Sequence, residues 1–221
     1  VDIKAENNAF TIDNALFTHE KSQVGLDLQV LFDRWAFEEL FFHVKTLNNT
    51  YVPADCKVPF LNVVANAQCD LKMTLNSLGF DLQGNIDTKD TVVYLSLGGD
   101  SNGETSSNNG GNDNFTMDLK VNIDPKTKLF YPNQESPIIR GLVYANQPLH
   151  MIIDSSGFSI YGDLQVRGGE ILYLSRNFYL KEGRIVFAES NGNFDPVITF
   201  RAEIPERDEF GELVRIILSA E

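Results

Sequence analysis

Apolar and polar residues alternate with a period of two over much of this chain. One run covers 24–32, where Val24, Leu26 and Leu28 are separated by Gly25 and Asp27. Because successive side chains of a strand point to opposite faces, this spacing predicts strands with one apolar face. The further runs that show it are 71–75, 80–86, 93–97, 115–123, 128–131, 138–145 and 149–153. The three successive runs 71–75, 80–86 and 93–97 predict a meander, and the whole series of runs predicts an all-β fold.

Three segments depart from this alternation. Residues 33–47 have apolar positions at helical spacing from Phe37 to Leu47, and Asp33 can cap a helix, but from Phe41 onward the stretch also fits a strand. The sequence therefore predicts a short helix near 34–40 followed by a strand. The first two dozen residues are mixed and weakly patterned. Residues 99–113 contain no apolar side chain and predict a flexible polar loop. A glycine-rich phosphate loop needs a following helix, and none is expected after 113.

Composition and charge narrow the class of partner. The 221 residues are 43% hydrophobic and 22% charged, which suits a single domain, 1–221, with a substantial core. The 31 acidic and 18 basic residues give a formal charge of −13, and no Lys or Arg cluster stands out. Nucleic acid is therefore an unfavourable partner, as is docking through a polybasic segment on an anionic membrane. Any lipid contact is expected with acyl chains.

Cysteine usage and hydropathy add little to this picture. Cys56 and Cys69 are close enough in sequence for a disulfide in an oxidising compartment, and two free thiols are the equal alternative. The three histidines, His19, His43 and His150, are scattered, so metal ligation with the cysteines is not expected. No apolar stretch approaches the roughly 20 residues of a transmembrane helix. The chain begins without Met, and we expect it to be a slice of a longer protein.

Glycines mark corners in the last third of the sequence. Residues 157–171 are GFSIYGDLQVRGGEI, and a second unit ends in LKEGRIVF at 180–187. Each unit predicts a strand, a glycine corner and a strand. The corner positions are Gly162, Gly168, Gly169 and Gly183, where a Cβ is costly if the sheet bends or another backbone comes close.

These motifs resemble the C-terminal domain of the TamB family. In that family a Gly-x-Leu-x-Val motif, a Gly and a Leu-x-x-Gly-x-Ile-x-Phe run lead to a Pro-containing strand, here 194–202, and the chain ends on a strand, here 213–219. The resemblance covers 157–219 and is only architectural upstream. The polar segment 99–113 and the two cysteines are not part of the family pattern. An elongated β-solenoid or sandwich with glycine turns is the alternative, although the absence of a fixed-length repeat disfavours a short-period β-helix.

The resemblance implies an elongated, curled, taco-like β-sheet with an apolar interior. It also implies a periplasmic setting in a diderm bacterium, as part of an inner-membrane-anchored protein. Members of the family are associated with phospholipid transport between the two membranes, and with outer-membrane biogenesis through a barrel partner of the Omp85 type, TamA- or BamA-like. The alternative role is a structural module that docks on that barrel by edge-strand pairing. End-to-end or edge-strand self-association follows from the same free edges.

We predict that one apolar face forms a groove for phospholipid acyl chains, with sealed core as the competing interpretation of each residue. Burial of hydrocarbon on such a surface contributes about 0.8 kcal/mol per CH₂. The predicted lining residues are Phe115, Met117, Leu119, Val121, Phe158, Ile160, Leu164, Val166, Ile185, Phe187, Ile198 and Phe200.

No catalytic constellation is expected, and neither is a cofactor. The acidic residues near the glycine corners are Asp163, Glu170, Glu182 and Asp195, and carboxylates at such turns are usually solvated or cap a corner. We predict that His150 is an ordinary surface histidine. No serine lies in a nucleophile-elbow motif. Asp100 and Asp113 bracket the polar loop without the spacing of a calcium loop. We therefore predict that the protein is not an enzyme and holds no metal.

Overall fold

The structure is a computed structural model that describes residues 2–6, 8–58, 61–95, 114–132, 136–188 and 196–220. Every regular element in these ranges is a β-strand. In chain order they are β1 Asp2–Glu6, β2 Ala9–His19, β3 Ser22–Asp33, β4 Ala36–Thr46, β5 Val52–Val58, β6 Leu61–Asn76, β7 Gly79–Leu95, β8 Phe115–Asn122, β9 Thr127–Tyr131, β10 Ile139–Ala145, β11 Leu149–Asp154, β12 Gly157–Tyr173, β13 Arg176–Ala188, β14 Val197–Arg207 and β15 Leu213–Ala220.

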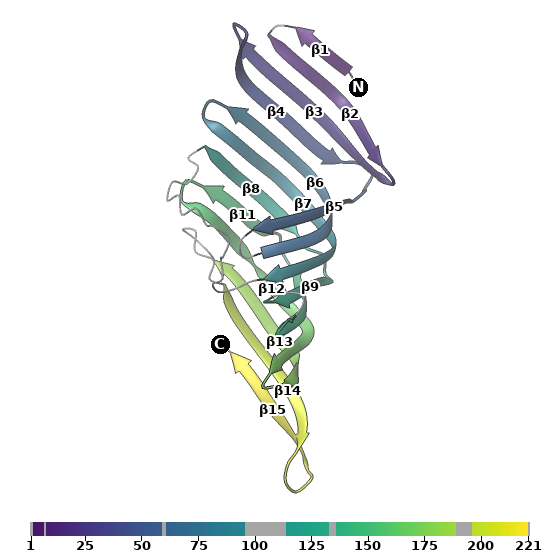
Figure 1. Cartoon of the computed structure of the whole chain (residues 1–221), viewed down its shortest axis with the longest axis vertical. Helices are drawn as coiled ribbons and strands as arrows, with labels where there is room; N and C mark the ends of the chain where they lie inside the picture. The colour runs from purple at the N-terminus through teal and green to yellow at the C-terminus, as the bar shows by residue number, and fades with distance from the viewer. Residues whose placement is uncertain are drawn as a thin grey trace.

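All these strands belong to one elongated, twisted sheet, which starts at β1 and ends at β15 (Figure 1). β8 and β9 follow one another along β7, and both are parallel to it. β11 and β10 follow one another along β12 in the same manner, and β4 and β5 along β6. Each of these pairs is therefore one long strand interrupted in the middle. Apart from the two parallel pairings of β7 with β8 and β9, all pairings are antiparallel, including those of β12 and β6 just described.

The interruptions line up across the sheet and produce a bend. The breaks are at 47–51, 123–126 and 146–148. In the continuous strands between them, β6 has a bulge between Val64 and Asn66, and Asp90 of β7 has a φ of 53°. Pairing places these positions side by side, since Asp87 lies opposite Asn122 and Val92 opposite Lys128. Bulges and left-handed residues bend strands, so the sheet folds along a line that crosses them.

Two apolar clusters lie on the inside of this bend. The larger contains Leu95, Leu129 and Val143 from one side of the bend together with Leu149 and Phe187 from the other. The smaller is built on Ile171, Phe178, Leu180 and Ala202. The observed all-β, curled single sheet confirms the predicted fold class. The segment 99–113, Leu97 and the first two residues of the predicted 194–202 strand lie outside the described residues.

The predicted helix at 34–40 is wrong. Arg34 and Trp35 both have left-handed φ angles, 48° and 69°, and form a two-residue hairpin turn between β3 and β4. Two successive positive φ values are typical of the type I′ turn that matches strand twist. The helical spacing was misleading because Phe41 and Phe42 lie on opposite faces of β4, which gives the strand apolar residues on both sides.

Other strand boundaries also differ from those expected. The run 80–86 and residues 93–95 of the run 93–97 belong to one strand, β7, whose alternation shifts at the Asp90 bend, so the predicted three-strand meander is a two-strand hairpin there. The weakly patterned N-terminus forms β1 and β2. The predicted strand, corner, strand units are the continuous strands β12 and β13. Glycine therefore bends these strands without ending them.

The four predicted corner glycines are not equivalent. Gly162 and Gly169 have φ angles of 152° and 150°, and a Cβ on Gly169 would lie 2.0 Å from the backbone oxygen of Arg140. Gly183 packs against Val166, whose Cβ would be 2.9 Å from an added Cβ. A Cβ on Gly168 would meet nothing within 4 Å. Three of the four positions therefore need glycine, and Gly168 does not.

Candidate functional site

All twelve predicted lining residues lie on the same face of the sheet. On β8 the pairing joins Met117 to Ile153 and Leu119 to Met151, and these continue to Phe158 and Ile160 of β12. On the C-terminal side Leu164 lies opposite Ile185, which lies opposite Ile198. Eight of the twelve pack in or against the larger cluster, and Phe200 packs against the smaller one. The structure thus brings together residues that the sequence could only assign strand by strand.

The same apolar face continues to the N-terminal edge, beyond the residues that sequence reasoning selected. One row of directly paired residues crosses nine strands from β1 to β12. It consists of Ile3, Ile12, Leu28, Phe42, Met73, Leu82, Met117, Ile153 and Phe158. The alternation in 24–32 and 71–75 was a usable signal, but only the register shows that these strands share a face.

The face differs in exposure between its two ends. In the described part of the chain, only Ala15 and Ala65 of the buried apolar residues precede Leu95. Leu28, Phe42 and Met73 are half-buried, so their side chains form an apolar wall that is partly open to solvent. We call the apolar face of β1–β4, with the Leu71–Asn76 half of β6, the open wall.

At the other end the face closes on itself, and we call the part of the sheet that holds the two apolar clusters the closed half. Leu119, Ile160, Leu164, Ile185 and Phe187 are buried, with exposures of 4–8%. Leu95, Leu129 and Val143 come from the far side of the bend and belong to one cluster with the last four of these residues. Sealed core, the competing interpretation, therefore fits these five of the twelve predicted lining residues. The other seven are half-buried.

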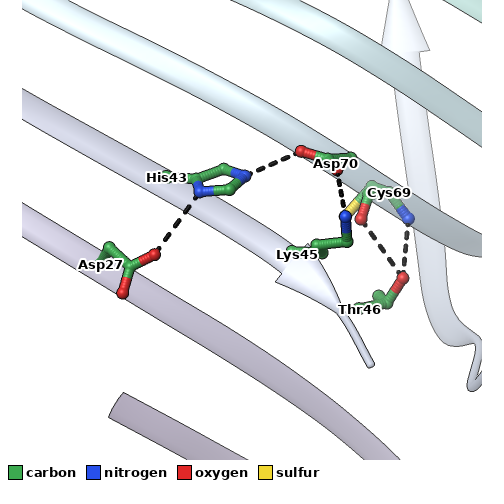
Figure 2. Close-up of polar contacts among 6 residues, drawn as sticks. All are labelled: Asp27, His43, Lys45, Thr46, Cys69 and Asp70. Carbon is green, nitrogen blue, oxygen red and sulfur yellow. Dashed lines mark hydrogen bonds and ion pairs between the residues drawn. The ribbon is translucent and has the colours of Figure 1, made fainter. Parts of the chain in front are cut away.

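The opposite face of the sheet is polar. On it the ring of His43 on β4 lies between two carboxylates of neighbouring strands (Figure 2). Its Nε2 is 2.7 Å from Asp70 Oδ1, and its Nδ1 is 3.5 Å from Asp27 Oδ2. Lys45 Nζ donates to Asp70 Oδ2 at 2.6 Å. The hydrogen bonds from Lys45 and His43 hold the pKa of the Asp70 carboxyl below its ordinary value of 3.8.

A buried threonine and a cysteine border this cluster. Thr46 is 3% exposed, and its hydroxyl accepts from Cys69 N at 3.0 Å and donates to Cys69 O at 3.2 Å (Figure 2). Burial raises the pKa of the Cys69 thiol, so this sulfur is a weak nucleophile. Cys56 lies opposite Val63, six positions from Cys69 along β6, or about 20 Å at the usual strand rise. The two free thiols are therefore too far apart to form a disulfide with each other.

The acidic residues considered for catalysis do not converge. Asp163 is engaged by Arg184, whose Nε and Nη2 donate to Oδ2 at 2.8 and 2.5 Å, and this pairing lowers the Asp163 pKa. Glu170 lies seven positions further along β12, roughly 20 Å away at the usual rise, whereas paired glycosidase carboxylates lie within about 10 Å. Glu182 is exposed, and Asp195 lies outside the described residues.

The remaining candidate residues also do not form a catalytic or metal-binding group within the described residues. His150 is half-exposed on the polar face, and its Nε2 is 2.7 Å from Asp118 Oδ1. Among the described residues no three His, Cys, Asp or Glu side chains are grouped to hold a metal ion. Within the same ranges no helix has the length and apolar character needed to cross a bilayer.

Comparison with protein-family models, with curated proteins and with solved structures found no match for this chain.

Proposed function

We propose that the chain is a lipid-binding and lipid-conducting domain whose apolar face holds phospholipid acyl chains. The observation that carries the proposal is the row of paired apolar residues from Ile3 to Phe158. A face of this length that is half-buried in β3, β4 and β6 has apolar area left to contact a ligand. Exposed contiguous apolar surface of this kind usually marks a binding surface.

The two faces of the sheet suit this role differently. The polar face carries paired charges such as Asp70 with Lys45, which keep it solvated. The apolar face lies inside the bend, where hydrocarbon chains are shielded from water. Each CH₂ group buried there stabilises the bound chain by about 0.8 kcal/mol. The net charge of −13 favours contact with acyl chains over attraction to anionic headgroups.

The proposed setting follows from the resemblance to the TamB family in residues 157–219. In that setting the chain is a periplasmic slice of an inner-membrane-anchored protein that supports phospholipid transport between the membranes. It would act together with an outer-membrane barrel of the Omp85 type. The curled single sheet is the architecture that the resemblance implies, and this agreement supports the proposal.

Adjacent residues on β3 provide a matched test. Leu28 belongs to the apolar row, and Gln29 is exposed on the polar face. Leu28→Arg places a charge on the acyl-chain surface, whereas Gln29→Arg adds the same charge to the same strand on the other side. We expect wild type and Gln29→Arg to co-purify with phospholipid, and Leu28→Arg to lose most of it. Native mass spectrometry with lipid extraction measures the ratio, and circular dichroism verifies that each variant is folded.

The outcomes separate the proposal from its alternative. Loss of lipid in folded Leu28→Arg alone supports an acyl-chain groove. Wild-type protein that carries no phospholipid and exchanges none with labelled vesicles would sink the proposal. Equal lipid in both variants would place any bound lipid elsewhere on the molecule.

A second candidate function, docking on a barrel by edge-strand pairing, is favoured by the C-terminal edge. Within the described residues β15 pairs only with β14, and it presents Leu213, Val214, Ile216 and Ile217 at exposures of 38–68%. An edge strand with exposed apolar residues is a template for an added strand. Ile217→Lys should abolish binding to a purified Omp85-type barrel, while Leu28→Arg should leave that binding intact. The reverse pattern would assign the barrel contact to the open wall.

A further inference from the structure

An apolar cavity of about 180 Å³ lies where the two clusters of the closed half meet. The residues that line it include Leu129, Ile139, Gly141, Ile171, Ile185 and Phe200. Its walls are almost entirely apolar. The cavity is partly open, so a ligand can reach it from outside.

The chemistry of the cavity restricts what can fill it. Water requires two to four polar partners, and an apolar site without them stays dry. An apolar cavity of roughly 150 Å³ can instead take up benzene. The cavity therefore suits a hydrocarbon group of about that size. Gly141 leaves part of the space, because a Cβ there would have only ordinary contacts, 3.6 Å from Val166 Cγ1.

The position of the cavity indicates which hydrocarbon it receives. Four of the predicted groove residues, Val166, Ile185, Ile198 and Phe200, also line the cavity, so it lies on the apolar face itself. The face is half-open in β3 and β4 and is closed here by Leu95 and Leu129. A chain that lies along the face thus meets a closed end with room for a short segment.

We propose that this cavity binds the terminal segment of one acyl chain, roughly six carbons long. The proposal rests on the proposed function for its choice of an acyl chain, but the cavity as an apolar ligand site stands independently of it. The closed half then acts as the end stop of the groove, and the carboxyl or headgroup end of the chain remains outside the cavity.

Two glycines on neighbouring strands allow a matched test. Gly141 on β10 lies opposite Gly169 and points into the cavity, whereas a side chain on Gly168 of β12 would meet open space. Gly141→Val fills the cavity, and Gly168→Val adds the same atoms outside it. Two probes are used. Binding of benzene is measured by calorimetric titration, and binding of a twelve-carbon fatty acid with a terminal CF₃ group is measured by ¹⁹F NMR. Ile198→Phe is a second filling variant if Gly141→Val does not fold.

We expect wild type and Gly168→Val to bind both probes and to shift the CF₃ resonance to a buried value. The filling variant should bind each of the two probes at least 10-fold more weakly than wild type. Equal binding in the filling variant, or no benzene binding by wild type, would overturn the cavity site. Benzene binding with an unshifted CF₃ resonance would overturn the acyl-chain assignment. These readouts are independent of the Leu28→Arg experiment, because phospholipid can co-purify on the open wall when the cavity is empty.

Discussion

The two halves of the sheet share one alternation pattern and reach opposite degrees of burial. In the closed half, Val143 is 1% exposed and Ile185 is 4% exposed. In the N-terminal part, Ile3 is 63% exposed and Phe17 is 57% exposed. The difference arises because the bend brings Leu95, Leu129 and Val143 over one half, while Leu28 and Phe42 of the open wall are only half-buried. A one-sided apolar strand therefore supplies either core or a binding surface, depending on what faces it.

This contrast has a consequence for stability. Hydrophobic stabilisation scales with the apolar area removed from water, so most of it comes from the closed half. The open wall is held by backbone pairing and by lateral contacts between paired side chains. We expect amide protons of β12 and β13 to exchange at the free energy of global unfolding, and those of β1 and β2 to exchange through local opening.

The largest effect is expected from removing a buried ring. Phe187→Ala should destabilise the protein by about 3–5 kcal/mol, because it removes a 7%-exposed side chain and leaves a cavity. Phe42→Ala on the open wall should cost only about 1–2 kcal/mol, because its ring is half-buried and solvent fills the space it leaves. Urea denaturation measures both values. Equal costs would show that the open wall is as well packed as the closed half.

Two adjacent glycines on β12, Gly168 and Gly169, test how tightly the backbone of the closed half is packed. Gly169→Ala should destabilise by about 3 kcal/mol, because its Cβ would lie 2.0 Å from the Arg140 carbonyl oxygen and its φ of 150° disfavours an L-residue. Gly168→Ala should change stability by less than about 0.5 kcal/mol, since its Cβ would be in open space. Thermal denaturation of the two variants is the measurement. A destabilised Gly168→Ala would show that a side chain at this position does not point into open space.

The smallest effect is expected from the polar face of the open wall. The pKa of Asp70 is lower in the folded chain than its ordinary 3.8, so its ionised form adds stability above that pH. This contribution is lost as the pH falls from about 3.8 through the folded pKa. Asp70→Asn should cost less than about 1 kcal/mol at neutral pH, because the pair with Lys45 is solvent-exposed.

The control for this prediction is the pH profile. Wild type should lose stability more steeply than Asp70→Asn below about pH 4, and the two denaturation midpoints should converge in strong acid. Parallel profiles throughout would mean that Asp70 has the same pKa in the folded and unfolded chains.

Local pattern predicted the strands well where one face is apolar and the other polar. Residues 24–32 are confirmed as part of β3, and residues 115–122 of the run 115–123 form β8, because each alternates cleanly. The pattern failed at 34–40, where Phe41 and Phe42 place apolar groups on both faces of β4. It also failed at Asp90, where a left-handed residue shifts the alternation within one strand. The first failure comes from apolar residues on both faces of one strand, and the second comes from a left-handed backbone residue that side-chain periodicity does not encode.

Sequence alone determined the all-β class and the residues that face the apolar side, such as Leu119, Ile160 and Phe187. Alternation decides this because the pleat sends neighbouring side chains to opposite faces. Only the tertiary structure decided that Leu28 lines an open wall and Ile185 lies in closed core. Burial depends on which distant strands the bend brings over a residue, and the aligned breaks at 47–51, 123–126 and 146–148 produce that bend jointly. No single strand contains that information.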